Sequence, residues 1–394
     1  MSFGYNILFS DNEVIALKDL LSYYPNMYIY SRLARIHLLI EYIRLSQLKA
    51  RKPLKAPLEV LFAITDRCNS NCIHCWAEGL NHGKDLPTKT IIDIIDKLAD
   101  AGVLHVTLSG GEPFLRSDIF DLIIRLKEYR IAVTILTNGV LLNEKTVNKL
   151  AKILDGDDII QVSLDGPNEA VYFKQRGIKA FHRVIDGIKL LKNHGIIVRT
   201  NFVATYVNVD YLVDTYILSN ELGVDIFSCS PVYPRSKGEK IHNRYTELKY
   251  LKELAKLNIL RKSNNFKTMI YPVLPLIAFE ILYDYYDNGK TVEEMPIFLP
   301  IENSVCSMNV EGKVFPGHLS FKKFQLGDLK EKSLLDIWNE AHEKGILPLV
   351  RDLSKTKCMK CKFLHLCRGG DTALTYRAYG TLDMPDPYCT LNPR

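Results

Sequence analysis

The sequence lacks a long, uninterrupted apolar run. Its most apolar stretch, residues 271–286, is broken by Pro272, Pro275 and Glu280, so it is a poor candidate for a membrane-spanning helix. Residues 1–13 carry neither a basic segment nor an apolar one, which argues against a secretion signal. We therefore expect a protein of the cytoplasm.

A strong excess of charge is missing too. Lys and Arg total 51 against 45 Asp and Glu, which gives a formal net charge of +6 over 394 residues. This mild excess does not indicate a nucleic-acid partner, and we expect none. Basic residues do gather between residues 32 and 55. We favour a solvated helix face there over a surface for an anionic membrane or an acidic peptide.

The chain shows no internal repeat and no low-complexity segment, and its length suggests two to three domains. From residue 59, apolar runs rich in β-branched residues alternate with helical patterns. The runs lie at 61–65, 103–109, 131–137, 159–164, 196–204 and 224–228. The helical patterns lie at 88–101, 117–130, 143–154, 181–194 and 209–222. This alternation predicts an α/β fold, a (β/α)6 partial TIM barrel whose parallel sheet is covered by helices on one face.

The regions outside the barrel have different patterns. We predict an N-terminal helical cap at 1–56, the barrel at 57–233, a helical bridge at 234–300 and an irregular C-terminal domain at 301–394. The cap is predicted from apolar residues at helical spacing between residues 33 and 43. The bridge is charged and rich in Tyr, whereas the last domain combines short strands, Gly turns and a group of cysteines.

Nine cysteines are present, and two groups of them are informative. Grouped cysteines in a reducing compartment are more typical of metal ligands than of disulfides. The first group is Cys68, Cys72 and Cys75, with the spacing C-x-x-x-C-x-x-C. Three thiolates on one loop can hold three irons of a cubane and leave the fourth iron open for a small molecule. A zinc site with a distant fourth ligand is the alternative, although zinc sites favour paired C-x-x-C units.

This spacing and its surroundings resemble the radical S-adenosylmethionine superfamily. The resemblance implies that the amino and carboxylate groups of S-adenosylmethionine chelate the open iron of a [4Fe–4S] cluster. It further implies reductive cleavage to a 5′-deoxyadenosyl radical that abstracts a hydrogen from the substrate, with a donor such as flavodoxin or ferredoxin supplying the electron. His74, the residue before the third cysteine, is implied to pack against the adenine.

Three further motifs fall at the ends of predicted strands. They are Ser109-Gly110-Gly111-Glu112-Pro113, Thr137-Asn138-Gly139 and Ser163-Leu164-Asp165-Gly166-Pro167, with Arg176 a little further on. Loops after successive parallel strands share one rim, where the active sites of such folds are built. Glycines without side chains let the backbone approach a ligand closely.

The resemblance implies cofactor contacts on this rim. The stretch with Gly110, Gly111 and Glu112 is implied to meet the methionyl amino group, and Asn138 is a further candidate. Ser163 and Arg176 are implied to meet the carboxylate, which an Arg fork suits well. The spacing from Ser163 to Arg176 is one residue longer than in the relatives that carry this pattern.

The second group of cysteines consists of Cys358, Cys361, Cys367 and the distant Cys389. Four thiolates can hold a [4Fe–4S] cluster or a zinc ion, and their number alone does not decide between the two. The neighbouring motifs are Gly312-x4-Gly317, Gly327-Asp328-Leu329, residues 334–339 and Cys367-Arg368-Gly369-Gly370. They resemble the SPASM extension of radical S-adenosylmethionine enzymes. The resemblance implies an auxiliary [4Fe–4S] cluster that these four cysteines ligate completely.

The chain departs from the full SPASM pattern, which holds two auxiliary clusters. One expected cysteine is missing after Gly312, where Gly317 follows, and another is replaced by Asp371. Cys306 survives from that set, and a metal site of Cys306, His318 and Asp371 is a minor alternative. We therefore predict one auxiliary cluster, and two [4Fe–4S] clusters in total.

The substrate is less well specified than the cofactors. The resemblance favours modification of a ribosomally made peptide by a crosslink, an epimerisation or an oxidation. The rivals are cofactor or small-molecule biosynthesis, including tetrapyrrole side-chain removal, then sugar or lipid modification, and an electron carrier that would form no 5′-deoxyadenosine. Cys229, at the end of the sixth predicted strand, is a candidate hydrogen donor to a substrate radical, although a buried thiol that only packs is commoner.

Overall fold

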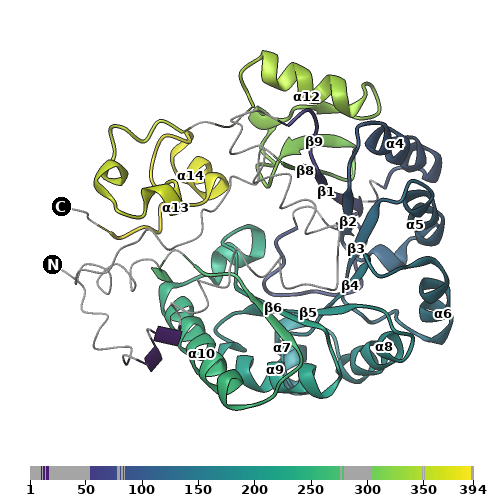
Figure 1. Cartoon of the computed structure of the whole chain (residues 1–394), viewed down its shortest axis with the longest axis vertical. Coiled ribbons are helices and arrows are strands. Elements are labelled where there is room, and N and C mark those ends of the chain that lie inside the picture. Colours follow the sequence, from purple (N-terminus) through teal and green to yellow (C-terminus); the bar gives the residue numbers. More distant parts are fainter. Residues whose placement is uncertain are drawn as a thin grey trace.

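The computed structural model describes residues 10, 12–13, 15–16, 54–77, 80, 83, 85–275, 277–278, 304–347, 349 and 351–391. In this part of the chain one curved sheet runs through the molecule, in the order β10-β9-β8-β1-β2-β3-β4-β5-β6-β7 (Figure 1). The helical pattern of residues 33–43, on which the predicted N-terminal cap depends, lies outside the described residues.

The first six strands form the predicted parallel ladder. They are β1 (Glu59–Thr65), β2 (His105–Gly110), β3 (Ala132–Thr137), β4 (Ile159–Ser163), β5 (Val198–Ala204) and β6 (Ile226–Pro231). Helices connect them, namely α4 (Thr88–Asp100), α5 (Ile119–Glu128), α6 (Glu144–Ile153), α7 (Glu169–Arg176), α8 (Phe181–Asn193) and α9 (Leu212–Glu221). The predicted α/β partial barrel is therefore confirmed.

The sheet extends beyond these six strands at both ends. Strand β7 (Met269–Pro272) pairs in parallel with β6, after the long helix α10 (Arg244–Ser263). The predicted helical bridge thus contains a strand, and residues 276 and 279–300 of it lie outside the described part. At the other end, β8 (Val305–Met308) pairs in parallel with β1, and β9 (Lys313–Pro316) and β10 (Gly327–Asp328) continue antiparallel. The domain boundaries stay a prediction.

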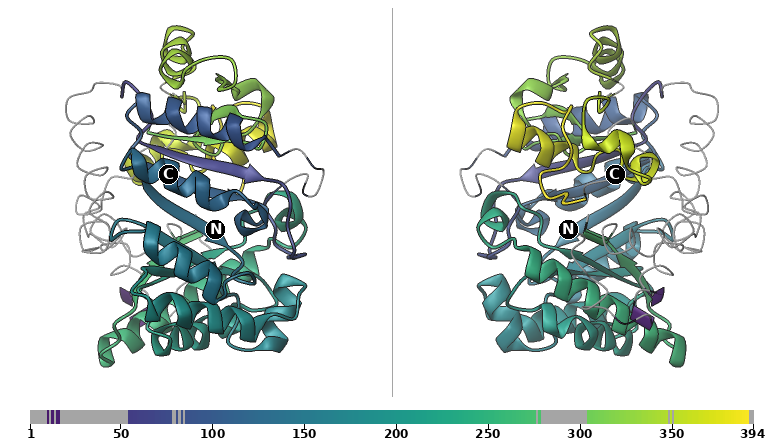
Figure 2. Two further views of the ribbon diagram at one scale, coloured as in Figure 1. Left: turned by 90° about the vertical axis from the view of Figure 1, so that its right-hand side faces the viewer. Right: turned by 90° about the vertical axis from the view of Figure 1, so that its left-hand side faces the viewer.

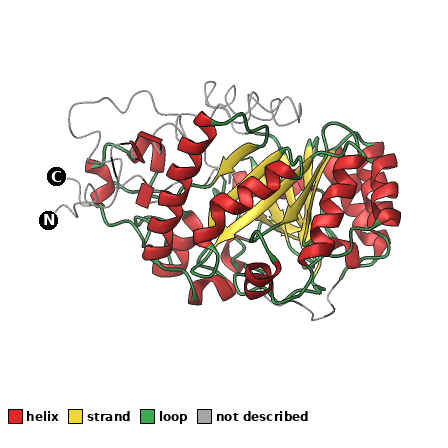
Figure 3. Cartoon of the chain, turned by 90° about the horizontal axis from the view of Figure 1, so that it is seen from below, coloured by secondary structure: helices red, strands yellow, loops and turns green. Residues whose placement is uncertain are grey.

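Alternation along the strands separates the core from the inside of the barrel. On β1, Val60, Phe62 and Ile64 are fully buried against the helix layer, whose apolar stripe on α4 includes Ile91 and Ile95. Glu59, Leu61 and Ala63 on the other face of β1 are only half-buried, whereas Thr65 at the end of the strand is buried. Figure 2 and Figure 3 show the helices stacked outside the strands. This arrangement leaves the inner face and the carboxyl rim of the sheet for the site.

The last part of the chain, after β10, contains only short helices and turns among its described residues. It contains α12 (Leu334–Glu343), a 3-10 turn η8 (Lys357–Lys360), α13 (Leu364–Cys367) and α14 (Thr372–Tyr379). Figure 1 places α13 and α14 across from the helix-covered side of the sheet. No helix of the described residues is both long enough and apolar enough to cross a membrane.

Candidate functional site

The first cysteine group occupies the loop that leaves β1. Cys68, Cys72 and Cys75 are all half-buried, and none forms a disulfide. The start of the loop is fixed by Asp85, whose carboxylate accepts hydrogen bonds from the Thr65 hydroxyl at 2.8 Å, the Asp66 backbone N–H at 2.9 Å and the Arg67 Nε at 2.9 Å. Asp85 was missed by the sequence reasoning because it lies in no motif.

The pKa values of two of these cysteines, Cys68 and Cys72, are raised. Burial raises the pKa of Cys68, to which the nearby Glu112 and Cys75 add. Burial also raises the pKa of Cys72, where the Arg176 guanidinium works in the opposite direction and Cys75 and Cys68 add to the rise. Mutually repelling thiolates require compensating cations, so metal binding here releases protons.

The glycines after β2 are required by a close approach of two backbones. Gly110 has a φ of +122°, and a Cβ there would overlap the Thr65 carbonyl oxygen, as a Cβ on Gly111 would overlap the Arg67 carbonyl oxygen. In this contact Gly111 N–H donates to the Thr65 carbonyl at 2.8 Å and Glu112 N–H donates to the Arg67 carbonyl at 2.7 Å. The two glycines thus join the β2 loop to the cysteine loop, and their cofactor contact stays a prediction.

Glu112 and Asn138 extend this support to the loop after β3. The fully buried Glu112 carboxylate accepts hydrogen bonds from the Thr137 hydroxyl at 2.8 Å and the Asn138 N–H at 2.7 Å. Burial raises the pKa of Glu112, and these hydrogen bonds oppose the rise. Asn138 Nδ2 in turn donates to Asn69 Oδ1 at 2.5 Å and to Ser70 Oγ at 3.2 Å. Both acceptors lie between the first two cysteines.

Helix α7 holds the other side of the loop with its C-terminal end. The Gln175 and Arg176 carbonyls accept hydrogen bonds from the N–H groups of Ile73 at 3.1 Å and Asn71 at 3.2 Å. The next residue, Gly177, ends the helix at φ +68°, where a Cβ would come within 2.7 Å of the Asn71 carbonyl oxygen. The cysteine loop is therefore clamped between β2, β3 and α7.

His74 lies inside this clamp, in a buried polar cluster with Gln175, Arg176 and Asp165. Its Nδ1 is 2.9 Å from Gln175 Nε2, and its Nε2 is 3.4 Å from Arg176 Nη1 and 3.7 Å from Asp165 Oδ2. Burial lowers the pKa of His74 to about 4, so the ring is neutral near pH 7. Gln175 was missed by the sequence reasoning, since a Gln at a helix end gives no signal.

Arg176 is the buried cation of the site. Its Nη1 is 3.4 Å from Asp165 Oδ2, and its pKa is raised despite burial because Cys72, Asp165 and Tyr172 lie nearby. Within the described residues, Arg176 Nε and Asp165 Oδ2 are buried without a hydrogen-bond partner. Ser163, the half-buried last residue of β4, makes no hydrogen bond to this cluster in the described part of the chain. An unsatisfied buried guanidinium N–H favours an anionic ligand.

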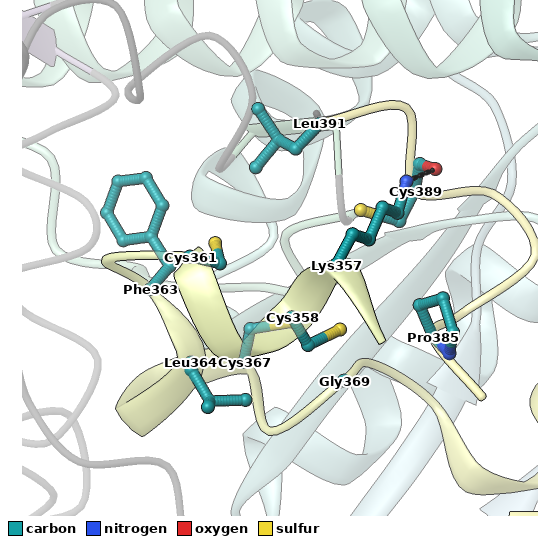
Figure 4. A pocket seen from close by; sticks show the side chains of 10 residues that line it. All are labelled: Lys357, Cys358, Cys361, Phe363, Leu364, Cys367, Gly369, Pro385, Cys389 and Leu391. Carbon is teal, nitrogen blue, oxygen red and sulfur yellow. Dashed lines mark hydrogen bonds between the residues drawn. The ribbon is translucent and has the colours of Figure 1, made fainter. Parts of the chain in front are cut away.

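The second cysteine group lines one cavity. Figure 4 shows the side chains around it, which are Lys357, Cys358, Cys361, Phe363, Leu364, Cys367, Gly369, Pro385, Cys389 and Leu391. Lys357 Nζ donates to the Cys389 carbonyl at 2.7 Å, which ties the distant fourth cysteine to the other three. The structure thus gathers all four predicted auxiliary ligands around one cavity, whose other lining residues are apolar apart from Lys357.

The backbone after Cys367 turns sharply toward its own thiol. Arg368, Gly369 and Gly370 have φ values of +50°, +88° and +83°, a succession that favours glycine. Burial raises the pKa of the Cys367 thiol to about 12, and a hydrogen bond from the Gly369 N–H to this sulfur opposes the rise. Backbone N–H groups aimed at a sulfur are the hydrogen bonds that tune cluster thiolates.

The minor alternative metal site is not assembled. Cys306 lies on β8 in the main core, and Asp371 caps α14 and accepts the Tyr233 hydroxyl at 2.9 Å. No three His, Cys, Asp or Glu side chains of the described residues stand together as ligands for a single metal ion.

Cys229 is packed in the second core. It is fully buried, Tyr250 Oη lies 3.6 Å from its Sγ, and burial raises its pKa to about 12. The next residue, Ser230, lines a cavity of about 490 Å³, and Cys229 itself does not. A hydrogen-donor role for Cys229 stays a prediction.

Three adjoining hollows lie between the first cysteine loop and the second cysteine group. The nearest, about 250 Å³, lies between Thr65, Trp76 and β8. It shares Arg235, His318 and Ser320 with a narrow hollow of about 40 Å³. That one shares Tyr233 and Leu374 with a third of about 490 Å³, which reaches Cys367. The series thus extends from Asp66 and Trp76, on either side of the first cysteine group, to Cys367 of the second.

Comparison with protein families assigns two regions of the chain. The model of the Radical SAM superfamily matches residues 62–218. The model of SPASM, an iron-sulfur cluster-binding domain, matches residues 300–362. The first region contains the loop of Cys68, Cys72 and Cys75, and the second reaches Cys358 and Cys361.

Curated relatives with different activities are similar over most of the chain. An AdoMet-dependent heme synthase of Methanosarcina barkeri is 26% identical over 346 residues, which are 86% of this chain and 97% of that protein. The mycofactocin maturase MftC of Mycolicibacterium smegmatis is 26% identical over 346 residues, or 85% of this chain and 83% of that protein. A probable GTP 3′,8-cyclase of Saccharolobus islandicus is 33% identical over 266 residues, which are 66% of this chain and 82% of that protein.

Among solved structures, SuiB of Streptococcus suis has the same fold. It superposes with a TM-score of 0.72 at 24% identity, covering 90% of this chain and 82% of that one.

Proposed function

We infer the function of this chain from its family, because it belongs to the Radical SAM superfamily and carries a SPASM iron-sulfur cluster-binding domain. It is a radical SAM enzyme. A [4Fe–4S] cluster and S-adenosylmethionine follow from the family, whereas the residues that hold them, the number of auxiliary clusters and the substrate are proposals.

We propose that Cys68, Cys72 and Cys75 hold the radical cluster, and the donor set fits this assignment. The three cysteines share one clamped loop, where Cys68 and Cys75 both raise the pKa of Cys72, and the buried Arg176 offsets their charge. When bound, the reduced cluster supplies the electron that cleaves S-adenosylmethionine to a 5′-deoxyadenosyl radical. The unsatisfied Arg176 Nε supports its proposed contact with the cofactor carboxylate.

The surrounding residues have three tasks in this proposal. Asn138 and the end of α7 hold the cysteine loop by hydrogen bonds, which would fix the three cysteines that hold the cluster. His74 is neutral near pH 7, so it packs beside the Arg176 guanidinium without placing a second positive charge there. The fully buried Glu112 fixes the loops after β2 and β3 against each other.

We propose a single auxiliary cluster, ligated by Cys358, Cys361, Cys367 and Cys389. The observation that supports it is the cavity that all four cysteines line. Anaerobic reconstitution followed by iron and sulfide analysis tests both assignments. We expect about eight irons per chain, and about four after Cys68, Cys72 and Cys75 are all changed to Ala, with loss of 5′-deoxyadenosine formation. About four irons in the wild type, vanishing in the variant, would contradict the auxiliary cluster.

For the substrate, we propose a ribosomally made peptide that is crosslinked, epimerised or oxidised. The observation that carries this proposal is the succession of three hollows, which suits an extended chain because each shares wall residues with the next. The similarity to a maturase over 85% of the chain agrees with it.

The test is co-expression of the enzyme with each short peptide encoded beside its gene, followed by mass spectrometry of the peptide. We expect a mass change in one peptide that disappears in the triple cysteine variant. A set of unchanged peptides, together with intact 5′-deoxyadenosine formation, would count against a peptide substrate while leaving the radical chemistry standing.

A tetrapyrrole is the second candidate substrate, and one observation favours it. The chain spans 97% of the length of an AdoMet-dependent heme synthase. The large hollow of about 490 Å³ has the size of an ordinary small-molecule pocket. Incubation with iron coproporphyrin III, S-adenosylmethionine and dithionite under anaerobic conditions separates the candidates. Loss of carbon dioxide from the porphyrin would support this substrate, and an unchanged porphyrin would exclude it.

A further inference from the structure

A chain of hydrogen bonds between buried side chains connects the loop after β5 to the cysteine loop. It runs from Asn208 through Thr205 and Gln175 to His74, and the first three of these residues are fully buried. Asn208 Nδ2 donates to two backbone carbonyl oxygens at 3.0 Å, one of them that of Val203. Because a carbonyl oxygen only accepts, these bonds fix the orientation of the Asn208 amide, and its Oδ1 accepts the Thr205 N–H at 2.7 Å.

Gln175 uses both N–H groups and the oxygen of its amide within this chain. Its Oε1 accepts the Thr205 hydroxyl at 2.7 Å, and its Nε2 donates to the Val203 carbonyl at 3.0 Å and to His74 Nδ1 at 2.9 Å. Because an amide NH2 group only donates, Nδ1 of His74 accepts this bond and carries no proton. The ring proton then lies on Nε2, so Gln175 fixes the tautomer of His74.

The tautomer decides how the His74 ring meets Arg176 and Asp165. Nε2 of His74 lies 3.4 Å from Arg176 Nη1 and 3.7 Å from Asp165 Oδ2. With the proton on Nε2, the ring and the guanidinium face each other as two donors, so they form no hydrogen bond and the Asp165 carboxylate is the acceptor beside both. With the proton on Nδ1, Nε2 would instead present a lone pair, which would accept a guanidinium N–H and repel the carboxylate.

The tautomer that Gln175 selects leaves donors of Arg176 unused. Arg176 Nε is buried and has no hydrogen-bond partner among the described residues, and the same is true of Asp165 Oδ2. Asp165 is held in place, because its Oδ1 accepts the Val203 N–H at 2.7 Å, and its Oδ2 lies 3.4 Å from Arg176 Nη1. A buried guanidinium whose donors are not taken up by a ring nitrogen is prepared for an anionic ligand.

We propose that Gln175 is a positioning residue of the cofactor site, which acts through His74 to keep the donors of Arg176 available for the carboxylate of S-adenosylmethionine. This inference rests on the proposed contact between Arg176 and that carboxylate. The Gln175 amide does not bind the cofactor itself, because both of its N–H groups are used within the protein. Its effect on cofactor binding therefore depends on His74, and this dependence can be measured.

Calorimetry of the reconstituted holoenzyme under anaerobic conditions measures this effect without turnover. The probe is S-adenosyl-L-homocysteine, which has the carboxylate but no sulfonium to cleave. The matched probe is 5′-methylthioadenosine, which lacks the amino-acid part. Gln175→Met keeps a side chain of similar shape and removes the amide. We expect this variant to bind S-adenosylhomocysteine about 10-fold more weakly, as for the loss of one to two hydrogen bonds, and methylthioadenosine within about 2-fold of the wild type.

A double-mutant cycle with His74→Leu distinguishes positioning from a structural role of Gln175. In the His74→Leu background, Gln175→Met should change the affinity for S-adenosylhomocysteine by less than about 2-fold, because the ring on which it acts is gone. The same loss of affinity in both backgrounds would show that Gln175 only packs α7 against β5, and would overturn the proposal. Neutron diffraction from crystals of the holoenzyme would locate the ring proton, and a proton on Nδ1 would overturn it as well.

Two further variants complete the set. Thr205→Val removes the hydroxyl that Gln175 Oε1 accepts, while the bond from Gln175 Nε2 to the Val203 carbonyl remains, so it should weaken S-adenosylhomocysteine by a smaller factor of about 3-fold. This variant takes the place of Gln175→Met in the cycle if that protein does not fold. The control is Gln325→Met, which changes the same residue type after the turn Lys322–Phe324 and should bind both probes as the wild type does.

Arg176→Gln separates this inference from the proposed function. It should weaken S-adenosylhomocysteine by on the order of 100-fold and methylthioadenosine hardly at all, because it removes the charged partner of the carboxylate. If Arg176→Gln has this effect and Gln175→Met binds as the wild type does, the positioning role is overturned and the proposed carboxylate contact stands. If Arg176→Gln binds S-adenosylhomocysteine as the wild type does, both are overturned. Equal weakening of the two probes by Gln175→Met would also overturn the positioning role, because the effect would then fall on the nucleoside.

Discussion

Asn138→Ala is the change that best isolates the support of the cysteine loop. It removes the two hydrogen bonds from Asn138 Nδ2 to Asn69 and Ser70, at 2.5 Å and 3.2 Å, and leaves the backbone bond from Asn138 N–H to Glu112 in place. It also removes the bond that Val140 N–H donates to Asn138 Oδ1 at 3.0 Å, but only the first two bonds reach the cysteine loop. Each lost bond is worth about 0.5–1.5 kcal/mol. The ordered loop therefore loses about 1–3 kcal/mol, and we expect iron to leave the first cysteine group on the order of 10- to 100-fold faster.

The assay is a chelator challenge of the reconstituted enzyme under anaerobic conditions. The proposed auxiliary cluster serves as an internal reference, because its four cysteines touch none of the bonds that are removed. The control variant is Asn148→Ala, which makes the same change on the exposed face of α6. Iron release from Asn138→Ala at the wild-type rate, or an equal acceleration of both halves of the iron, would refute the reasoning.

Three further outcomes are expected. Gly110→Ala should destabilise the protein by several kcal/mol and lower its iron content, because φ +122° and the nearby Thr65 carbonyl exclude a side chain. Thermal unfolding and iron analysis measure both effects, and the control Gly156→Ala, whose new methyl group meets open space, should change neither. Cys389→Ala should remove about four irons and Cys306→Ala none, and a loss in both would contradict our ligand set. The pKa of His74 is lowered to about 4 in the folded protein. Between about pH 6.5 and 4, His74 therefore binds a proton in the unfolded chain but not in the folded one. Stability of the iron-free protein should therefore fall over that window by up to about 3 kcal/mol, and His74→Asn should flatten the slope in urea unfolding, while parallel slopes would contradict this.

Long periodic segments of the barrel were predictable, and short ones were not. The predicted helix at 88–101 corresponds to α4 at Thr88–Asp100, and the predicted strand at 131–137 to β3 at Ala132–Thr137. Strand β7, Met269–Pro272, was missed because four residues that end in proline show no period. Helix α7 was missed for a similar reason, since its eight residues are only weakly amphipathic.

The candidate site was predicted by its motifs but not by its contacts. The sequence places cysteines, glycines, Asn138 and Arg176 on one rim, and the structure brings these loops into hydrogen-bonding contact. The pairing of Arg176 with Asp165 and the bond between His74 and Gln175 depend on how α7 returns over the cysteine loop. Such tertiary contacts join residues far apart in the chain, and no local pattern encodes them.

The position of β8 in the sheet has a consequence for synthesis of the chain. β1 is flanked by β2 on one side and by β8 on the other. Residues 59–65 leave the ribosome 240 residues before residue 305 (305 − 65), the start of β8. At about 5–20 residues per second, that interval lasts on the order of 12–50 s. During it, the strand that carries the cysteine loop has an open edge, the kind of surface on which nascent chains pair with one another.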